Sequence, residues 1–302
     1  MKAIYLQWVT ATIGSLGCLL PSQSLAQTYP DQPQRIPGRR AYSTTLRDES
    51  SGGMNRFFEV RAGARICTIN GKLRPGLDGS SDLDLGDDLG LDGIEAGPQF
   101  DFEMKVSPEW HARFSFAGSY FDGPTKTTTR AITYQSPTAT PNNPTRTPVT
   151  LAVGSRLQTK FEINSFSGMT WYEGYKTENF VLGPSVGFKA IFYDETITIF
   201  NAGTRLTSVD NTEVDEVTPL VGAEMRLQVN PNVYVGMSPY GFALDKYYYL
   251  GGNGYIGFDF DKEWGLRFGL DVDHLVVEFT EASKYSASST LLAAFVQGVY
   301  GF

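Results

Sequence analysis

The segment 81–93, SDLDLGDDLGLDG, places five aspartates among leucines and glycines within thirteen residues. Carboxylates are the ligands that hard divalent cations prefer, so the segment is a candidate for bridging Ca²⁺ or Mg²⁺. An EF-hand loop needs glycine at its sixth position and glutamate at its twelfth. Here Asp87 and Gly93 occupy those positions, which excludes an EF-hand. The candidate metal ligands are Asp82, Asp84, Asp87, Asp88 and Asp92.

Residues 1–26 have the pattern of a secretory signal peptide. Lys2 supplies a basic start, residues 9–20 are largely apolar, and Ser24-Leu25-Ala26 is a cleavage-type sequence. Cys18 is also compatible with a lipoprotein processing box, although that box lacks its first leucine. Residues 27–54 are polar and without periodicity, which predicts a disordered linker. The folded domain is therefore expected over 55–302.

Charge and composition restrict the class of protein. Without Lys2 the chain keeps 24 basic residues against 33 acidic ones, which argues against nucleic acid as a partner. No run of 18 apolar residues follows the signal, so no membrane helix is expected. Aromatic residues make up 13% of the chain, 32 residues are glycine, and helical patterning is missing. An exported, all-β protein with one remaining cysteine, Cys67, is predicted.

Strict alternation of apolar and polar residues recurs along the chain after residue 57. In 94–106 the apolar positions include Phe100 and Phe102, and the intervening positions include Asp101 and Glu103. The same alternation recurs in 110–120, 218–229 and 264–272. This period of two predicts strands that present one apolar and one polar face.

The connections between these strands are of two kinds that alternate along the chain. Short polar connections occur at 107–109, 173–178, 230–232 and 261–263. Longer polar loops are predicted at 71–93, 123–149, 195–214 and 279–285, with a short one at 245–246. Tight turns on one rim and longer loops on the other are typical of a transmembrane β-barrel.

The predicted fold is an all-β, transmembrane, antiparallel up-and-down barrel of about ten strands, with eight or twelve also compatible. Trp110 and Trp264 directly follow short turns, where an interfacial aromatic girdle belongs. A secreted soluble β-sandwich is the alternative. The expected strands are 57–69, 94–106, 109–122, 151–172, 178–194, 215–229, 233–244, 248–260, 263–278 and 286–302.

Two short motifs carry a family resemblance. The chain ends LLAAFVQGVYGF, with alternating apolar residues before Phe302, and 84–91 fits the pattern D-L-x-x-D-L-G-L. Both resemble segments of Gram-negative outer-membrane β-barrel proteins. The resemblance implies an outer-membrane location, contact with lipid and lipopolysaccharide, and recognition of Phe302 and Tyr300 by the barrel-assembly machinery. The other face of the last strand, which includes Phe295 and Val299, is less polar than a lumen would suggest.

The aspartate-rich segment then lies between the first and second strands, on the outer side of the membrane if the N-terminus is periplasmic. We predict a structural loop that folds over or into the barrel mouth. Bridging of Ca²⁺ or Mg²⁺ at the outer rim is the alternative, because lipopolysaccharide carries such ions.

Catalysis is not expected, and neither is a cofactor. The two histidines, His111 and His274, are predicted at opposite rims of the barrel. Asp271 and Asp273 accompany His274, but without the Asp-x-His spacing of omptin-type proteases, and His-x-Ser, which other outer-membrane hydrolases use, does not occur. A serine without a positioned base stays unactivated.

The predicted inward-facing charges are of mixed sign, which favours a plugged lumen of paired charges. The protein would then have a structural or surface-interaction role, as a monomer. A small or gated porin-like channel is the alternative, and the Thr/Pro-rich loop 123–149 leaves an adhesin open. The predicted inward set is Glu59, Arg61, Arg65, Asp101, Glu103, Lys105, Arg113, Lys160, Glu162, Lys189, Glu224, Arg226, Arg267 and Asp271.

Overall fold

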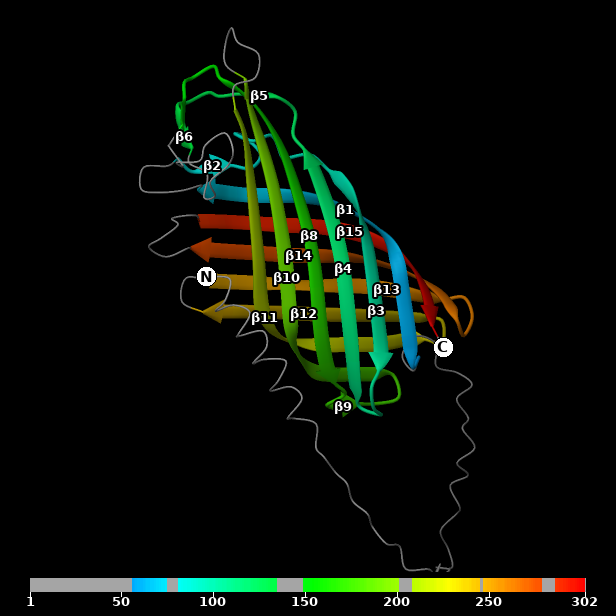
Figure 1. Cartoon of the computed structure of the whole chain (residues 1–302). Coiled ribbons are helices and arrows are strands. Elements are labelled where there is room, and N and C mark those ends of the chain that lie inside the picture. The colour runs from blue at the N-terminus through cyan, green and yellow to red at the C-terminus, as the bar shows by residue number, and fades with distance from the viewer. Residues whose placement is uncertain are drawn as a thin grey trace, which may run out of the picture. The chain divides into compact units, whose positions relative to one another are not determined.

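The computed structural model describes residues 56–74, 81–134, 149–200, 208–244, 247–278 and 286–301. The predicted signal peptide and linker lie outside them. Ten long strands dominate (Figure 1): β1 Phe58–Arg74, β3 Glu95–Lys105, β4 Trp110–Asp122, β8 Arg156–Tyr172, β10 Phe180–Phe200, β11 Ser208–Asn230, β12 Val233–Leu244, β13 Tyr247–Asp259, β14 Trp264–Glu278 and β15 Ser286–Gly301. The short strands are β2 Leu83–Asp84, β5 Lys126–Thr127, β6 Ile132–Tyr134, β7 Val149–Leu151 and β9 Tyr175–Lys176.

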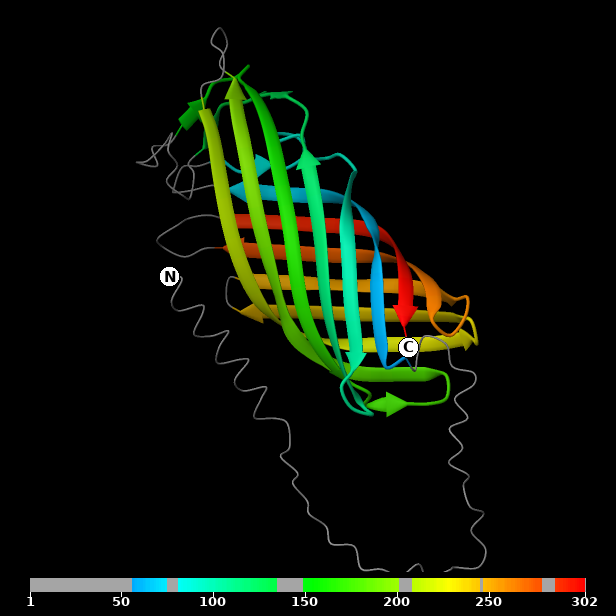
Figure 2. The ribbon, with the colours of Figure 1, turned by 45° about the vertical axis from the view of Figure 1, so that its right-hand side comes forward.

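The ten long strands close into one antiparallel barrel. Each pairs with its neighbour in chain order, and β8 pairs with β10. The first and last strands close the ring from Glu59 opposite Gly301 to Arg74 opposite Ser286. Figure 2 shows the continuous wall. The prediction of a ten-stranded up-and-down barrel is confirmed, and a sandwich of two sheets is not formed.

The two ends of the barrel differ, as the spacing of turns predicted. We call the end with the connections at 106–109, 231–232 and 260–263 the turn end, and the opposite end the loop end. No helix among the described residues is long and apolar enough to cross a membrane.

Strands β10 and β11 are longer than the sequence suggested, because part of the predicted loop 195–214 is strand. Their ladder continues from Ser208 opposite Ile199 through Thr212 opposite Glu195. Ile197 and Ile199 are buried while the intervening threonines are partly exposed. Isoleucine and threonine both favour strands, so the prediction of a loop at 195–200 is wrong.

The outer face of the barrel is an apolar belt. Large apolar side chains that point away from the lumen stay exposed in the isolated chain, and Trp110 and Trp264 keep about half of their surface exposed at the turn end. Such a belt needs a lipid environment, because soluble monomers rarely expose large apolar patches. Its members include Ile66, Phe100, Phe114, Phe116, Val186, Leu227, Met237, Ile256, Phe268, Leu270, Leu292 and Val296.

The inward set was predicted correctly except at two positions on β8. Lys160 faces outward with 63% of its side chain exposed and pairs with Asp122, and Glu162 shares its face. The residues that face inward here are apolar, among them Phe161 and Ile163. Polarity is reversed in this part of the strand, since its inner side packs against an apolar core and its outer side carries charges.

Candidate functional site

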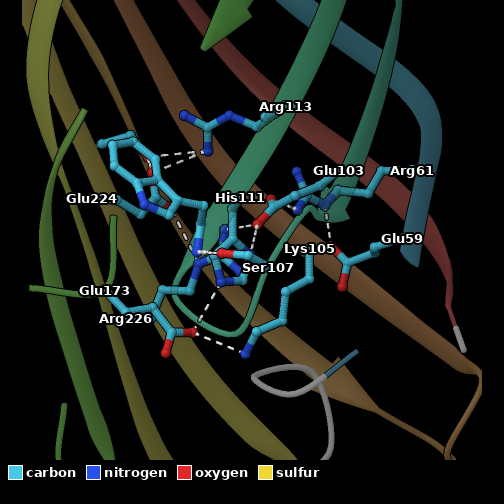
Figure 3. A network of polar contacts seen from close by, with 12 residues as sticks. Glu59, Arg61, Glu103, Lys105, Ser107, His111, Arg113, Glu173, Glu224 and Arg226 are labelled. Atoms are coloured by element: carbon cyan, nitrogen blue, oxygen red, sulfur yellow. Dashed lines mark hydrogen bonds and ion pairs between the residues drawn. The ribbon is translucent and has the colours of Figure 1, made fainter. Parts of the chain in front are cut away.

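The lumen is the candidate site, and near the turn end it is filled by a network of ion pairs (Figure 3). Glu103, 4% exposed, accepts hydrogen bonds from Arg61 and from Nη2 of Arg226, the latter at 2.5 Å. Arg226 also pairs with Glu224 at 3.1 Å, and Arg113 pairs with Glu224 at 3.2 Å. These residues come from β1, β3, β4 and β11. We call them, together with Glu59 and Arg267, the ion-pair layer.

Aromatic rings stack on the cations of the ion-pair layer. The guanidinium carbon of Arg226 lies 4.9 Å from the ring centroid of Trp171, and His111 stacks on Trp171 with centroids 4.0 Å apart. Arg267 lies 3.9 Å from the ring centroid of Tyr255. Cation–π contacts of this kind gain strength when desolvated. The layer is therefore packed as well as charge-paired.

The segment that follows β8 contacts His111, which lies beside this layer. Glu173 follows β8, and its buried carboxylate lies 2.9 Å from Nε2 of His111 and 2.7 Å from Nζ of Lys176. Burial opposes its ionisation, yet these hydrogen bonds and the charge of Lys105 hold the pKa of Glu173 below its ordinary value. Glu173 is not among the inward-facing residues predicted from the sequence. Its one signal was phase, because it continues the inward series of Met169 and Trp171.

The loop end of the lumen is closed by the aspartate-rich segment. Leu83, Leu85, Leu89 and Leu91 are 1–3% exposed and belong to one apolar cluster inside the barrel wall. We call residues 83–91 the plug. The predicted loop does fold into the barrel mouth, since leucines alternating with polar residues place one face inward. Wall residues of the cluster include Cys67, Ile69, Phe121, Leu157, Phe161, Ile191, Ile197 and Leu291.

The aspartates of this segment form hydrogen bonds that stabilise the plug, and their carboxylates do not gather around one position. A carboxylate oxygen of Asp84 accepts the backbone N–H groups of Gly86 and Asp87, at 3.0 and 2.9 Å. Arg130 donates to Asp88 at 2.6 Å and to the carbonyl oxygen of Asp82. Asp87 and Asp92 are exposed.

Cation binding by the five aspartates stays a prediction. Over the part of the chain that is described, no three His, Cys, Asp or Glu side chains gather as a metal site would require. The cations that bond to these carboxylates are Arg74, at Asp82, and Arg130, at Asp88.

The plug should loosen in acid through Asp82. Its hydrogen bond with Arg74, 2.5 Å from Nε, is the main cause that holds the pKa of Asp82 below its ordinary value. A depressed pKa stabilises the fold above the ordinary value, about 4, and this contribution is lost as pH falls through the lowered one. We expect Arg74→Ala to remove part of the decrease in the urea midpoint between about pH 6 and pH 3.

The effect should be small and salt-sensitive, because both side chains are about half exposed. A parallel decrease in the wild type and the variant would contradict it. Lys262→Ala, with an exposed side chain in the connection at the turn end, serves as the charge-matched control.

A second cluster of buried polar side chains lies between the ion-pair layer and the plug. Nζ of Lys189 lies 2.5 Å from Asp273, which also accepts hydrogen bonds from Tyr240, at 3.1 Å, and from Tyr249. The rings of the two tyrosines are parallel, with centroids 6.1 Å apart. Sequence reasoning grouped Asp273 with His274 and missed this contact.

The histidines do not meet, as predicted. His111 is buried at the turn-end start of β4, whereas His274 lies in β14 beyond Asp273. His274 pairs across the outer face with Thr290, with Nδ1 and Oγ1 2.8 Å apart. Since successive side chains of a strand point to opposite faces, Asp273 and His274 lie on opposite sides of the wall.

The last strand has the predicted phase. Tyr300 faces outward, and its ring centroid is 4.8 Å from that of Trp264, while Val299 and Ala293 are fully buried. Phe295 packs inside the lumen with Tyr234 and Tyr255. The low polarity of the inner face thus reflects aromatic packing. Phe302 lies outside the described residues.

No protein-family model and no curated protein sequence matches the chain. Solved structures do. The outer membrane protease OmpT from Escherichia coli superposes with a TM-score of 0.54 at 11% identity, covering 81% of this chain and 97% of that one. This chain has the outer-membrane β-barrel fold. An apolar belt and an aromatic girdle are features of barrels in the outer membrane. Such barrels have short turns on the periplasmic side and longer loops outside, and we propose this orientation for the turn end and the loop end.

Other outer-membrane proteins are more distant. OprG from Pseudomonas aeruginosa has a TM-score of 0.34 at 8% identity, covering 84% of this chain and 97% of that one. Ail, the attachment invasion locus protein of Yersinia pestis, has 0.30 at 10% identity, covering 78% and 97%. These scores are too low to support a conclusion. At 11% identity the likeness to OmpT concerns the fold alone.

Proposed function

We propose that the protein is a non-conducting outer-membrane barrel with a structural or surface-interaction role. The observation that carries this proposal is the double closure of the lumen, by the ion-pair layer on the periplasmic side and by the plug on the extracellular side. An open pore would need a continuous polar path, and the apolar plug interrupts it.

The extracellular extension of the wall favours surface interaction. A strand crosses a bilayer in about 9–11 residues, whereas β8, β10 and β11 have 17, 21 and 23 residues. Figure 1 shows these strands rising past the others at the loop end. Their outward residues there, such as Lys160, Asp194 and Glu162, are partly or fully exposed polar groups that suit water. The predicted adhesin loop is described only at 123–134 and 149.

The role is proposed to be non-catalytic, although one similar fold belongs to a protease. Asp273 faces the lumen and is engaged by Lys189, while His274 faces outward. A general base must lie within hydrogen-bond reach of its partners, and the wall separates these two. Contact of Tyr300 and Phe302 with the assembly machinery, and of the belt with lipopolysaccharide, remain parts of the proposal.

Planar-bilayer recording tests the closure. We expect no stable conductance steps from the refolded wild type. A variant with both closures opened, Leu83→Ser, Leu89→Ser, Glu103→Ala and Arg226→Ala, should give steps and shows that the assay can detect a pore. Folding of each sample is checked by its heat-dependent shift on a denaturing gel, since closed barrels resist detergent. Reproducible steps from the wild type would reject the proposal in favour of a small porin-like channel.

A further inference from the structure

A small chamber lies in the lumen between the two closures. Its volume is about 50 Å³, and it is lined by Arg61 and Arg113 of the ion-pair layer on one side and by Leu220 of the apolar cluster on the other. Its wall combines polar and apolar groups. A buried water occupies about 10–15 Å³ on this scale, so the chamber has room for about three or four. Further lining residues are Arg65, Gln99, Asp101, Ser115, Asn253 and Asp271.

Two polar side chains face this chamber from adjacent strands. Asp271 and Asn253 are cross-strand partners on the inward face of β14 and β13. Both remain partly exposed, and because the other face of the wall meets lipid, that exposed surface belongs to the chamber. Neither side chain forms an ion pair or hydrogen bond with another described residue. A carboxylate in this position needs solvation.

Neighbouring lining residues are incompletely satisfied as well. Oε1 of Gln99, Oε1 of Gln297, the hydroxyl of Tyr255 and Nε of Arg267 are buried and form no hydrogen bond within the described chain. The first two are acceptors and Nε is a donor, so a molecule that both donates and accepts can serve them. Buried polar groups are usually satisfied in this way.

Most of the cations around the chamber already have carboxylate partners, which argues against a bound ion. Of the five cations that line the chamber, four form ion pairs with carboxylates: Arg61 with Glu59 and Glu103, Arg113 with Glu224, Lys189 with Asp273, and Arg267 with Glu59. The fifth, Arg65, donates hydrogen bonds to Ser119 and to the carbonyl oxygen of Gly118. An added cation or anion would be uncompensated in a low-dielectric interior. A small, neutral, hydrogen-bonding ligand fits best.

We propose that the chamber is a site for about three or four resident water molecules, which hydrate Asp271 and Asn253 and bridge to the glutamines beside them. These waters are long-lived, because the ion-pair layer and the plug separate them from both compartments. The long residence time of the waters depends on the proposed closure of the lumen. Their presence in the chamber does not depend on it.

Two measurements test the site in the refolded full-length barrel. Oxygen-17 magnetic relaxation dispersion counts waters that stay longer than the tumbling time of the protein, and a crystal structure grown in bromide locates waters and ions. We expect dispersion from about three or four waters, water density beside Asp271, and no anomalous peak in the chamber. The absence of both the dispersion signal and the water density would overturn the proposal. A bromide peak in the chamber would overturn it in favour of an anion site.

The variant Ala117→Val decides between a hydrated and an empty chamber. Ala117 lines the chamber and is 7% exposed. If waters fill the space, the added methyl groups displace them and lower the melting temperature, with loss of the dispersion signal. Ala96→Val, on the outward face of β3, is the matched control and should change neither. A raised melting temperature for Ala117→Val would show that an empty cavity had been filled, which contradicts the site.

One outcome separates the two proposals. Waters in the crystal without dispersion in solution would mean that they exchange freely with bulk solvent. The water site would then stand, and the closed lumen would fail.

Discussion

Glu103→Gln is expected to destabilise the barrel by about 3–5 kcal/mol, the cost of removing one partner from a buried charge network. The carboxylate is the shared partner of Arg61 and Arg226, and Nδ1 of His111 lies 3.6 Å from it. All four groups are nearly inaccessible to solvent. Glutamine keeps the shape of the side chain and removes the charge, so the change isolates the electrostatic loss.

Urea unfolding in lipid vesicles measures this effect, and Asp122→Asn is its control. Asp122 pairs with Lys160 at 3.3 Å, but the two side chains are 59% and 63% exposed. An exposed pair contributes about 0–1 kcal/mol. Similar losses for the two variants would mean that water penetrates the ion-pair layer, and the periplasmic closure would have to be abandoned.

Leu89→Ala is expected to free the plug. Leu89 is 1% exposed within the apolar cluster, and truncation of such a leucine costs about 2–5 kcal/mol. Cys67 is a free cysteine, 1% exposed in the same cluster, so the accessibility of its thiol measures opening of the cluster. If opening of the plug exposes the thiol, its labelling rate should rise at least about 30-fold.

Thiol labelling followed by peptide mass analysis measures this rate and assigns it to Cys67 rather than Cys18. Asp87→Ala is the control, because Asp87 lies in the same segment with an exposed side chain. It should change stability by less than about 0.5 kcal/mol. An unchanged labelling rate in Leu89→Ala would show that the plug does not cover the barrel interior at Cys67.

The strands of the wall and the direction of most of their side chains could be predicted from the sequence, because each strand has one face toward lipid and one toward the lumen. Phe100 and Asp101 alternate since one side of the wall faces lipid and the other the lumen. The rule failed on β8 at Lys160 and Glu162, and in the segment 195–200. In both places the wall extends beyond the proposed membrane span, where its outer side is polar and its inner side packs against the plug.

The sequence by itself determined the antiparallel barrel, its strand order and the inward direction of most charges, because these depend on a period of two and on turn length. Only the tertiary structure decided which charges meet. Glu103 and Arg226 are 123 residues apart in the chain, and Leu83 and Leu89 find their partners on strands throughout the wall. Contacts across a lumen follow from ring closure and strand stagger, which no local pattern encodes.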